Sequence, residues 1–114
     1  MSDIQNANQI SFEYKGKTYC LEYTRETVKS MESAGFRVNE MGEMPATRIE
    51  QLWTGAFLAH HRKAVGDGNV MDIYRAIKDK KGILKKLVEM YNRTLEYLLP
   101  DEDDEGNVEW TATL

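Results

Sequence analysis

A periodic apolar stripe near the C-terminus constrains the fold more than any other feature of the sequence. Over residues 83–99 the apolar side chains recur every three or four positions: Leu84, Leu87, Val88, Tyr91, Leu95 and Leu98. This spacing places all of them on one side of an α-helix, and Pro100 is suited to ending that helix. A helix with so long a stripe must bury it against other elements. We therefore expect a helical core built around residues 83–99.

Two more helices are predicted in the middle of the chain. The segment 46–65 follows Pro45, which suits the first turn of a helix. Its stripe recurs at helical spacing: Ile49, Leu52, Trp53, Ala56, Phe57 and His60. The segment 70–79 follows Asn69, which can cap a helix, and it repeats the pattern: Val70, Ile73, Tyr74 and Ile77. We expect the first of these two, the most aromatic helix of the chain, to be central.

A shorter helix is predicted over residues 25–34. Thr24 can cap its beginning through the side-chain hydroxyl, and Gly35 is the kind of residue at which a helix ends. Val28 and Met31 stand three positions apart and lie on the same side of such a helix. We expect these two side chains to point into the core.

Residues 10–23 alternate between apolar and polar side chains, which is typical of a β-hairpin. The apolar residues form two rows, which we expect on two faces: Ile10, Phe12 and Tyr14, and then Tyr19, Leu21 and Tyr23. Gly16 lies between the rows and can take the positive φ that a short loop requires. A two-stranded hairpin is only marginally stable alone, so it must pack on helices or pair with a further strand.

Together these elements predict a mainly α fold with a small N-terminal β-hairpin, of the α+β class. A chain of 114 residues has room for one domain. We assign residues 1–100 to a single globular domain, because the composition, 41% hydrophobic and 30% charged, is that of an ordinary globular protein. We assign residues 101–114 to an acidic spacer and a short C-terminal strand.

The formal net charge of -4 is concentrated in one run of five consecutive acidic residues, 101–105. Without these five carboxylates the rest of the chain carries about +1. Binding to nucleic acid through its phosphates requires a clear basic excess, which this balance lacks. We therefore expect no nucleic-acid partner.

Cys20 is the only cysteine, so the chain can form no internal disulfide and no thiolate metal site, and a reducing cytoplasm suits it. No run of 18 or more apolar residues is present, and residues 1–10 are polar, without a basic region followed by an apolar core. We expect no membrane partner, no export signal and a location in the cytoplasm.

Candidate chemical sites are few. His60 and His61 are adjacent, and adjacent helical residues point about 100° apart, so they cannot hold one ion together. The acidic run resembles the start of a calcium-binding loop, but Ala112 stands where a bidentate glutamate is required. Five lysines near Gly82 are typical of a solvated helix face, or else they dock an acidic partner or the chain's own acidic run: Lys78, Lys80, Lys81, Lys85 and Lys86. We expect no enzyme activity, no cofactor and no metal ion.

The segment between the first and second predicted helices has no helical period, yet it is unusually apolar for a loop. Phe36, Met41 and Met44, next to Trp53, are the candidate partner-binding residues, because methionine adapts its shape to irregular apolar partners. The sequence leaves an alternative open. In that alternative, Met31 fills the core and the other two methionines are ordinary loop residues.

The C-terminal tail carries the candidate self-association residues, which alternate with polar ones as in a strand: Val108, Trp110, Ala112 and Leu114. The hairpin should leave at least one sheet edge unpaired, and such an edge can accept a strand from another chain. Repetition of that head-to-tail contact makes a ring or an open helix, so we expect a homo-oligomer. The alternatives are that the tail folds back on its own hairpin or remains disordered.

Seven runs over roughly residues 10–95 stand out by their order and spacing: Phe12–Tyr19, Leu21–Arg25, Met31–Phe36, Leu52–Phe57, His60-His61, Ile73-Tyr74 and Met90-Tyr91. In that order and spacing they resemble the tail assembly chaperones of long-tailed phages and prophages of Gram-positive bacteria. No single motif among them is a chemical signature.

The resemblance implies a non-catalytic protein that coats the long, helical tape-measure protein in the cytoplasm of the infected cell, before tail-tube subunits replace it. It implies the tape-measure protein as the main partner, tail-tube subunits as a second partner, and self-association. The alternative is a regulatory adaptor, like an antitoxin, that inhibits one globular partner. It predicts a stoichiometric complex with a compact protein and no affinity for long helices.

Overall fold

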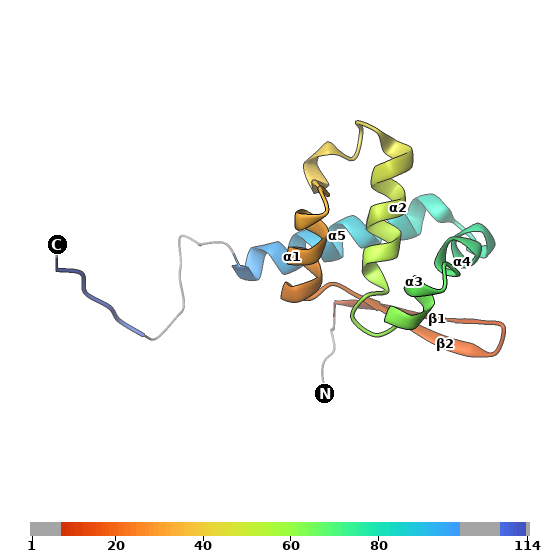
Figure 1. The fold of residues 1–114 in the computed structure, drawn as a ribbon, viewed down its shortest axis with the longest axis horizontal. Coiled ribbons are helices and arrows are strands. Elements are labelled where there is room, and N and C mark those ends of the chain that lie inside the picture. The colour runs from red at the N-terminus through yellow and green to blue at the C-terminus, as the bar shows by residue number, and fades with distance from the viewer. Residues whose placement is uncertain (1–7, 99–107, 114) are drawn as a thin grey trace.

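The computed structural model describes residues 8–98 and 108–113. An N-terminal hairpin is followed by helices, which confirms the predicted class. In chain order the elements are β1 (Gln9–Tyr14), β2 (Lys17–Glu22), α1 (Arg25–Ser33), the short 3-10 helix η1 (Val38–Glu40), α2 (Pro45–Ala56), α3 (Arg62–Gly66), α4 (Val70–Ala76) and α5 (Lys80–Leu98). Helices α1 and α2 cross over α5, and the hairpin extends beneath α3 and α4 (Figure 1).

The hairpin closes through a two-residue turn in which both residues have positive φ, 50° at Lys15 and 80° at Gly16. This geometry matches the right-handed twist of paired strands. Ile10 lies opposite Leu21, and Phe12 lies opposite Tyr19. The two apolar rows therefore form one face, and the expectation of two faces is wrong, because cross-strand partners project to the same side of a sheet.

Helix α1 begins with a capping box. The Thr24 hydroxyl accepts from the Thr27 backbone N–H at 3.2 Å, and the Thr27 hydroxyl accepts from the Thr24 backbone N–H at 2.8 Å. The helix is followed by Gly35, whose φ is +99°. The prediction for this helix is confirmed, and Val28 and Met31 are buried as expected.

The predicted helix over 46–65 is wrong in its second half. Helix α2 ends at Ala56, and a turn leads to the short α3. The reason is tertiary: the chain turns so that the ring of His61 faces β2, where its Nε2 accepts from the Cys20 backbone N–H at 2.9 Å. The apolar period continues through the turn because Phe57, just after the end of α2, is itself fully buried.

The last two helices are shifted from their predicted bounds. Helix α4 ends at Ala76, and α5 begins at Lys80, three residues before its predicted start. The Asp79 carboxylate accepts from the Gly82 backbone N–H at 3.1 Å, as an N-terminal cap does. The Lys80 ammonium group donates to the backbone oxygens of Arg75 and Ile77, both at 3.0 Å, and closes the end of α4.

The core is aromatic and lies between α2, α5 and the hairpin. Its largest fully buried side chains are Trp53, Tyr91, Phe36, Phe57, Leu21 and Leu52. Two polar aromatic side chains of the core donate to backbone oxygens. The Trp53 indole N–H donates to the Val70 backbone oxygen at 2.7 Å, and the Tyr23 hydroxyl donates to the Leu52 backbone oxygen at 2.6 Å.

Residues 108–113 form neither helix nor strand, and all six are exposed. Val108 is 84% exposed and Trp110 is 82% exposed. The predicted C-terminal strand is therefore not formed within a single chain over these residues, and pairing with a second chain stays a prediction. Leu114 and the acidic run lie outside the described residues.

Candidate functional site

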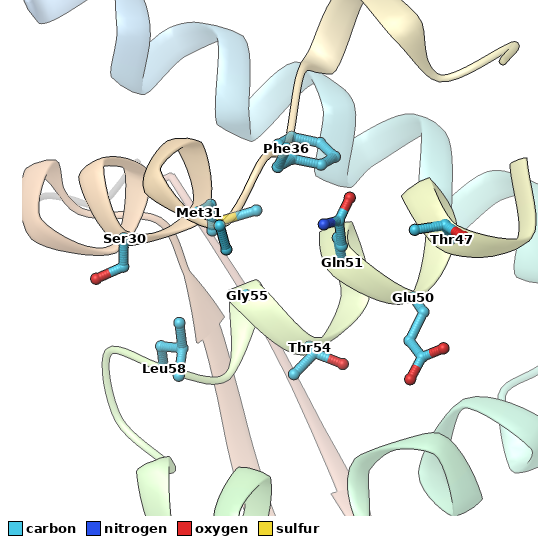
Figure 2. Close-up of a pocket in the computed structure, with 10 residues that line it drawn as sticks. Ser30, Met31, Phe36, Thr47, Glu50, Gln51, Thr54, Gly55 and Leu58 are labelled. Atoms are coloured by element: carbon cyan, nitrogen blue, oxygen red, sulfur yellow. The ribbon is translucent and has the colours of Figure 1, made fainter. Parts of the chain in front are cut away.

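An apolar groove of about 320 Å³ lies between the C-terminal half of α1 and helix α2 (Figure 2). Its apolar lining comes from both helices and from the residues that follow them: Met31, Ala34, Phe36, Gly55 and Leu58. Polar side chains complete the lining: Ser30, Thr47, Glu50, Gln51 and Thr54. Most of these polar residues are exposed, so the groove has an apolar floor and a polar rim.

The groove depends on the absence of a side chain at Gly55. The Met31 side chain extends from α1 toward this glycine (Figure 2). A Cβ atom at position 55 would overlap the sulfur and the terminal methyl group of Met31. Gly55 therefore lets the methionine lie close over α2 as the floor of the groove.

Behind the floor, Phe36 is fully buried and connects the groove to α5. Its ring packs edge-on against Tyr91, with 5.1 Å between ring centroids. Burial, with the negative charge of Glu32 adding to it, raises the pKa of the Tyr91 phenol to about 12. The phenol is thus neutral at physiological pH, and the floor rests on an uncharged aromatic layer.

One arginine fixes the end of the groove where the chain passes from α1 to α2. The Arg48 guanidinium donates to the Gly35 backbone oxygen at 2.7 Å and to the Gln51 side-chain oxygen at 3.0 Å. Its other terminal nitrogen pairs with the Glu40 carboxylate at 3.0 Å. The segment from α1 to η1 is therefore held against α2, and this wall of the groove exists before any partner binds.

A family model described as a domain of unknown function (DUF5055) matches residues 4–114, nearly the whole chain. The chain belongs to the DUF5055 family. No significant match to it was found among curated proteins or among solved structures. The functional assignment therefore depends on the residues and the groove of this DUF5055 domain.

The four predicted partner-binding residues of this DUF5055 chain do not form one surface. Phe36 and Trp53 are both 0% exposed. Phe36 lies in the apolar lining of the groove, whereas Trp53 does not line it. Met41 is half-buried and packs against the core, and Met44 is 63% exposed. The cause is packing. In the segment before α2, Phe36 and Met41 attach the chain to the core.

The groove residues that sequence reasoning missed were partly visible in the sequence. Met31 was expected to point into the core and was not among the four predicted partner-binding residues, and Gly55 and Leu58 were not considered. A glycine inside a predicted helix weakens that helix, and such a residue often has a packing reason. Gly55 was therefore the available signal for a close contact on one side of α2.

The two histidines face β2 but do not share a ligand. The His61 ring accepts from Cys20, and burial lowers its pKa, with the positive charge of Lys17 and the neighbouring His60 adding to the effect. The His60 ring pairs with the Glu22 carboxylate at 2.6 Å. Over residues 8–98 and 108–113, no group of three or more His, Cys, Asp or Glu side chains is placed to hold a metal ion. None of the described helices combines the length and the apolar character needed to cross a membrane.

Proposed function

We propose that the chain is a non-catalytic phage tail assembly chaperone that works in the host cytoplasm. In this function the groove between α1 and α2 receives apolar helix faces of the tape-measure protein during tail morphogenesis. The observation that carries the proposal is the groove itself, in which Met31 lies over Gly55 beneath a polar rim.

The groove has the features that helix recognition requires. An amphipathic helix presents a row of apolar side chains, and an apolar groove removes that row from water. Met31 provides a flexible, polarizable floor, which suits a partner whose apolar residues vary along its length. Ser30 and Glu50 at the rim can remain solvated beside the polar flanks of the bound helix.

The residues that resemble tail assembly chaperones overlap those that line the groove. The run Met31–Phe36 supplies three lining residues, and the run Leu52–Phe57 supplies Thr54 and Gly55. Both runs lie at the groove although they are separated by the segment that precedes α2. This overlap supports a common role for the two runs in binding.

A charged side chain placed in the groove tests the proposal. Ala34 is exposed and lines the groove, so Ala34→Glu adds a carboxylate there without changing a buried residue. Ala46 is also an exposed alanine, lies near the start of α2 and does not line the groove, so Ala46→Glu is the control. Each variant is co-expressed with the tape-measure protein, and the amount that copurifies is measured.

We expect Ala34→Glu to reduce copurification by about tenfold or more, since burial of an unpaired carboxylate exceeds the 1.4 kcal/mol that a tenfold change represents. Ala46→Glu should bind as the unchanged chain does. Circular dichroism must show that both variants retain their helices. Equal copurification of the two folded variants would refute the groove as the binding site. A one-to-one complex with a compact protein, without binding to tape-measure helices, would favour the regulatory adaptor instead.

A further inference from the structure

The outer edge of β1 has backbone groups that the hairpin does not use. With a two-residue turn, Tyr14, Phe12 and Ile10 form the hydrogen-bonded pairs of the ladder. The intervening residues Ser11 and Glu13 then direct their backbone N–H and C=O groups away from β2. Within the described residues the sheet has only two strands, so this edge has no neighbouring strand.

The outer edge of β2 differs, because a side chain occupies it. Cys20 lies opposite Ser11, and its outward N–H donates to the ring of His61 at 2.9 Å. The His60–Glu22 pair lies beside the same strand. A strand from another molecule would have to displace these contacts on β2, whereas none of them blocks the edge of β1.

A shallow depression of about 530 Å³ separates Ile10 of β1 from the first turns of α5. Ile83 contributes to its apolar part, and three exposed lysines surround it: Lys78, Lys85 and Lys86. We call these three residues the lysine flank.

Two acidic residues also line the depression, and both are engaged. The Asp79 carboxylate caps α5, and Glu89 forms an exposed pair with Lys86 at 3.5 Å. Lys78 and Lys85 make no ion pair with another described residue. The flank is therefore able to bind an acidic segment that passes beside β1.

The chain carries such a segment next to a strand-like one. Five consecutive acidic residues, 101–105, precede Val108 and Trp110, which alternate with polar residues and are more than 80% exposed. We propose that residues 108–113 of a second copy of this chain add as a strand to the outer edge of β1. The acidic run of that copy is then attracted to the positive charge of the lysine flank. Val108 and Trp110 extend the apolar face of the sheet beside the half-buried side chains of Ile10 and Phe12.

The chain's own tail is the less favourable occupant. It leaves the fold at Leu98, while the lysine flank lies at the other end of α5. The stretch from Lys85 to Leu98 is about 20 Å long at 1.5 Å per residue. The nine residues 99–107 span at most about 30 Å, so to bring residue 108 back to the flank they would have to reverse direction along α5 and use about two thirds of that reach. A tail that enters from another molecule has no such restriction, and the contact it makes is head-to-tail, which closes into a ring or continues as a helix.

A single substitution on β1 tests the added strand. Ser11→Pro removes the outward N–H, and proline is tolerated on an edge strand where the N–H does not serve the ladder. Ser11→Ala is the matched control, because it removes the hydroxyl but keeps the N–H. Sedimentation velocity of the full-length chain over a range of concentrations should show association that Ser11→Pro abolishes and Ser11→Ala retains.

A charge exchange gives a second test that does not depend on the fold of the proline variant. One full-length variant has Asp101, Asp103 and Asp104 changed to Lys, and the other has the three lysines of the flank changed to Glu. Each variant alone should be monomeric, because like charges meet at the contact. An equimolar mixture should associate again, because each tail then faces a flank of opposite charge.

A full-length chain that is monomeric at every concentration would overturn the proposal, and so would association that neither the proline nor the charge exchange weakens. The contact uses none of the residues that line the groove between α1 and α2. Ala34→Glu should therefore leave self-association unchanged, so this inference and the proposed function can fail separately.

Discussion

Helix α2 has two sides that are packed in opposite ways. On one side Trp53 is fully buried, with its ring centroid 5.2 Å from that of Phe57 and 5.1 Å from that of Tyr74. On the other side Gly55 has no side chain, and a groove of about 320 Å³ remains open above Met31. The difference separates two roles within one helix. The filled side stabilises the fold, and the unfilled side carries the candidate binding groove.

The largest effect is expected on the filled side. Trp53→Ala removes a fully buried indole and leaves the Val70 backbone oxygen without its donor. We expect the free energy of unfolding to fall by about 3–5 kcal/mol, measured by urea denaturation. Trp53→Phe should lose less, because it keeps an aromatic ring at the site. A loss below about 1 kcal/mol for Trp53→Ala would show that this side of α2 is not the centre of the core.

On the unfilled side, a substitution should weaken binding while changing stability little. Gly55→Ala adds one carbon that overlaps the flexible end of Met31 and pushes it into the groove. The gain in helix propensity of up to about 1 kcal/mol offsets part of the overlap, so we expect stability to change by less than about 1 kcal/mol. Binding of the tape-measure protein should nevertheless weaken by several-fold in the same copurification assay.

A second substitution separates filling of the groove from other causes. Met31→Val in the Gly55→Ala background removes the overlapping sulfur and methyl group, and it should restore part of the binding while the floor stays apolar. If the double variant binds no better than Gly55→Ala, then displacement of Met31 into the groove is not what weakens binding. Urea denaturation of both variants keeps losses of binding distinct from losses of stability.

Features that local chemistry decides could be predicted from the sequence, and features that distant contacts decide could not. Helix α1 and the hairpin turn were predictable because local chemistry decides them, through the Thr24 cap and the positive φ of Gly16. The end of α2 was not, because the bond from Cys20 to His61 joins residues 41 positions apart. The groove was missed because it depends on a close contact between α1 and α2, in which Met31 lies over Gly55, and an apolar pattern does not report contacts between elements.

The same limit explains why the four predicted partner-binding residues do not form one surface. An apolar residue in a loop has no periodicity to indicate which way it points. Nothing in the sequence therefore indicated that Phe36 packs on Tyr91 in the core. Only the tertiary arrangement distinguishes it from Met44, which is exposed.

The contact between the hairpin and the turn after α2 should make the stability of the chain depend on pH. The folded state lowers the pKa of His61, so the unfolded chain binds a proton more readily there. The resulting stability is fully present above the unfolded pKa of about 6.5 and is lost as the pH falls toward the lower folded pKa. Protonation also removes the lone pair that accepts from Cys20. We therefore expect the chain to be less stable at pH 5 than at pH 7.

His61→Gln is the informative variant, because its side-chain oxygen can still accept from the Cys20 N–H but does not titrate. The part of the pH dependence that lies between pH 7 and 5 should become smaller in this variant and remain in His60→Gln. Thermal unfolding at several pH values provides the measurement. An unchanged pH profile in His61→Gln would mean that other groups cause the loss. Binding in the groove should be unaffected in both variants at pH 7, since neither histidine lines it.

The smallest effect is expected at Met44, and it decides between the groove and the loop surface as the binding site. Met44 precedes α2 with a left-handed φ of 54°, makes no side-chain cap, and is 63% exposed. Asparagine adopts this conformation more readily than methionine does, so Met44→Asn should stabilise the chain by up to about 1 kcal/mol. Because Met44 does not line the groove, tape-measure binding should not change. If partner recognition used the exposed methionine, the same variant would be more stable and yet bind less. Measurement of the melting temperature and of copurification on one preparation therefore separates the two sites.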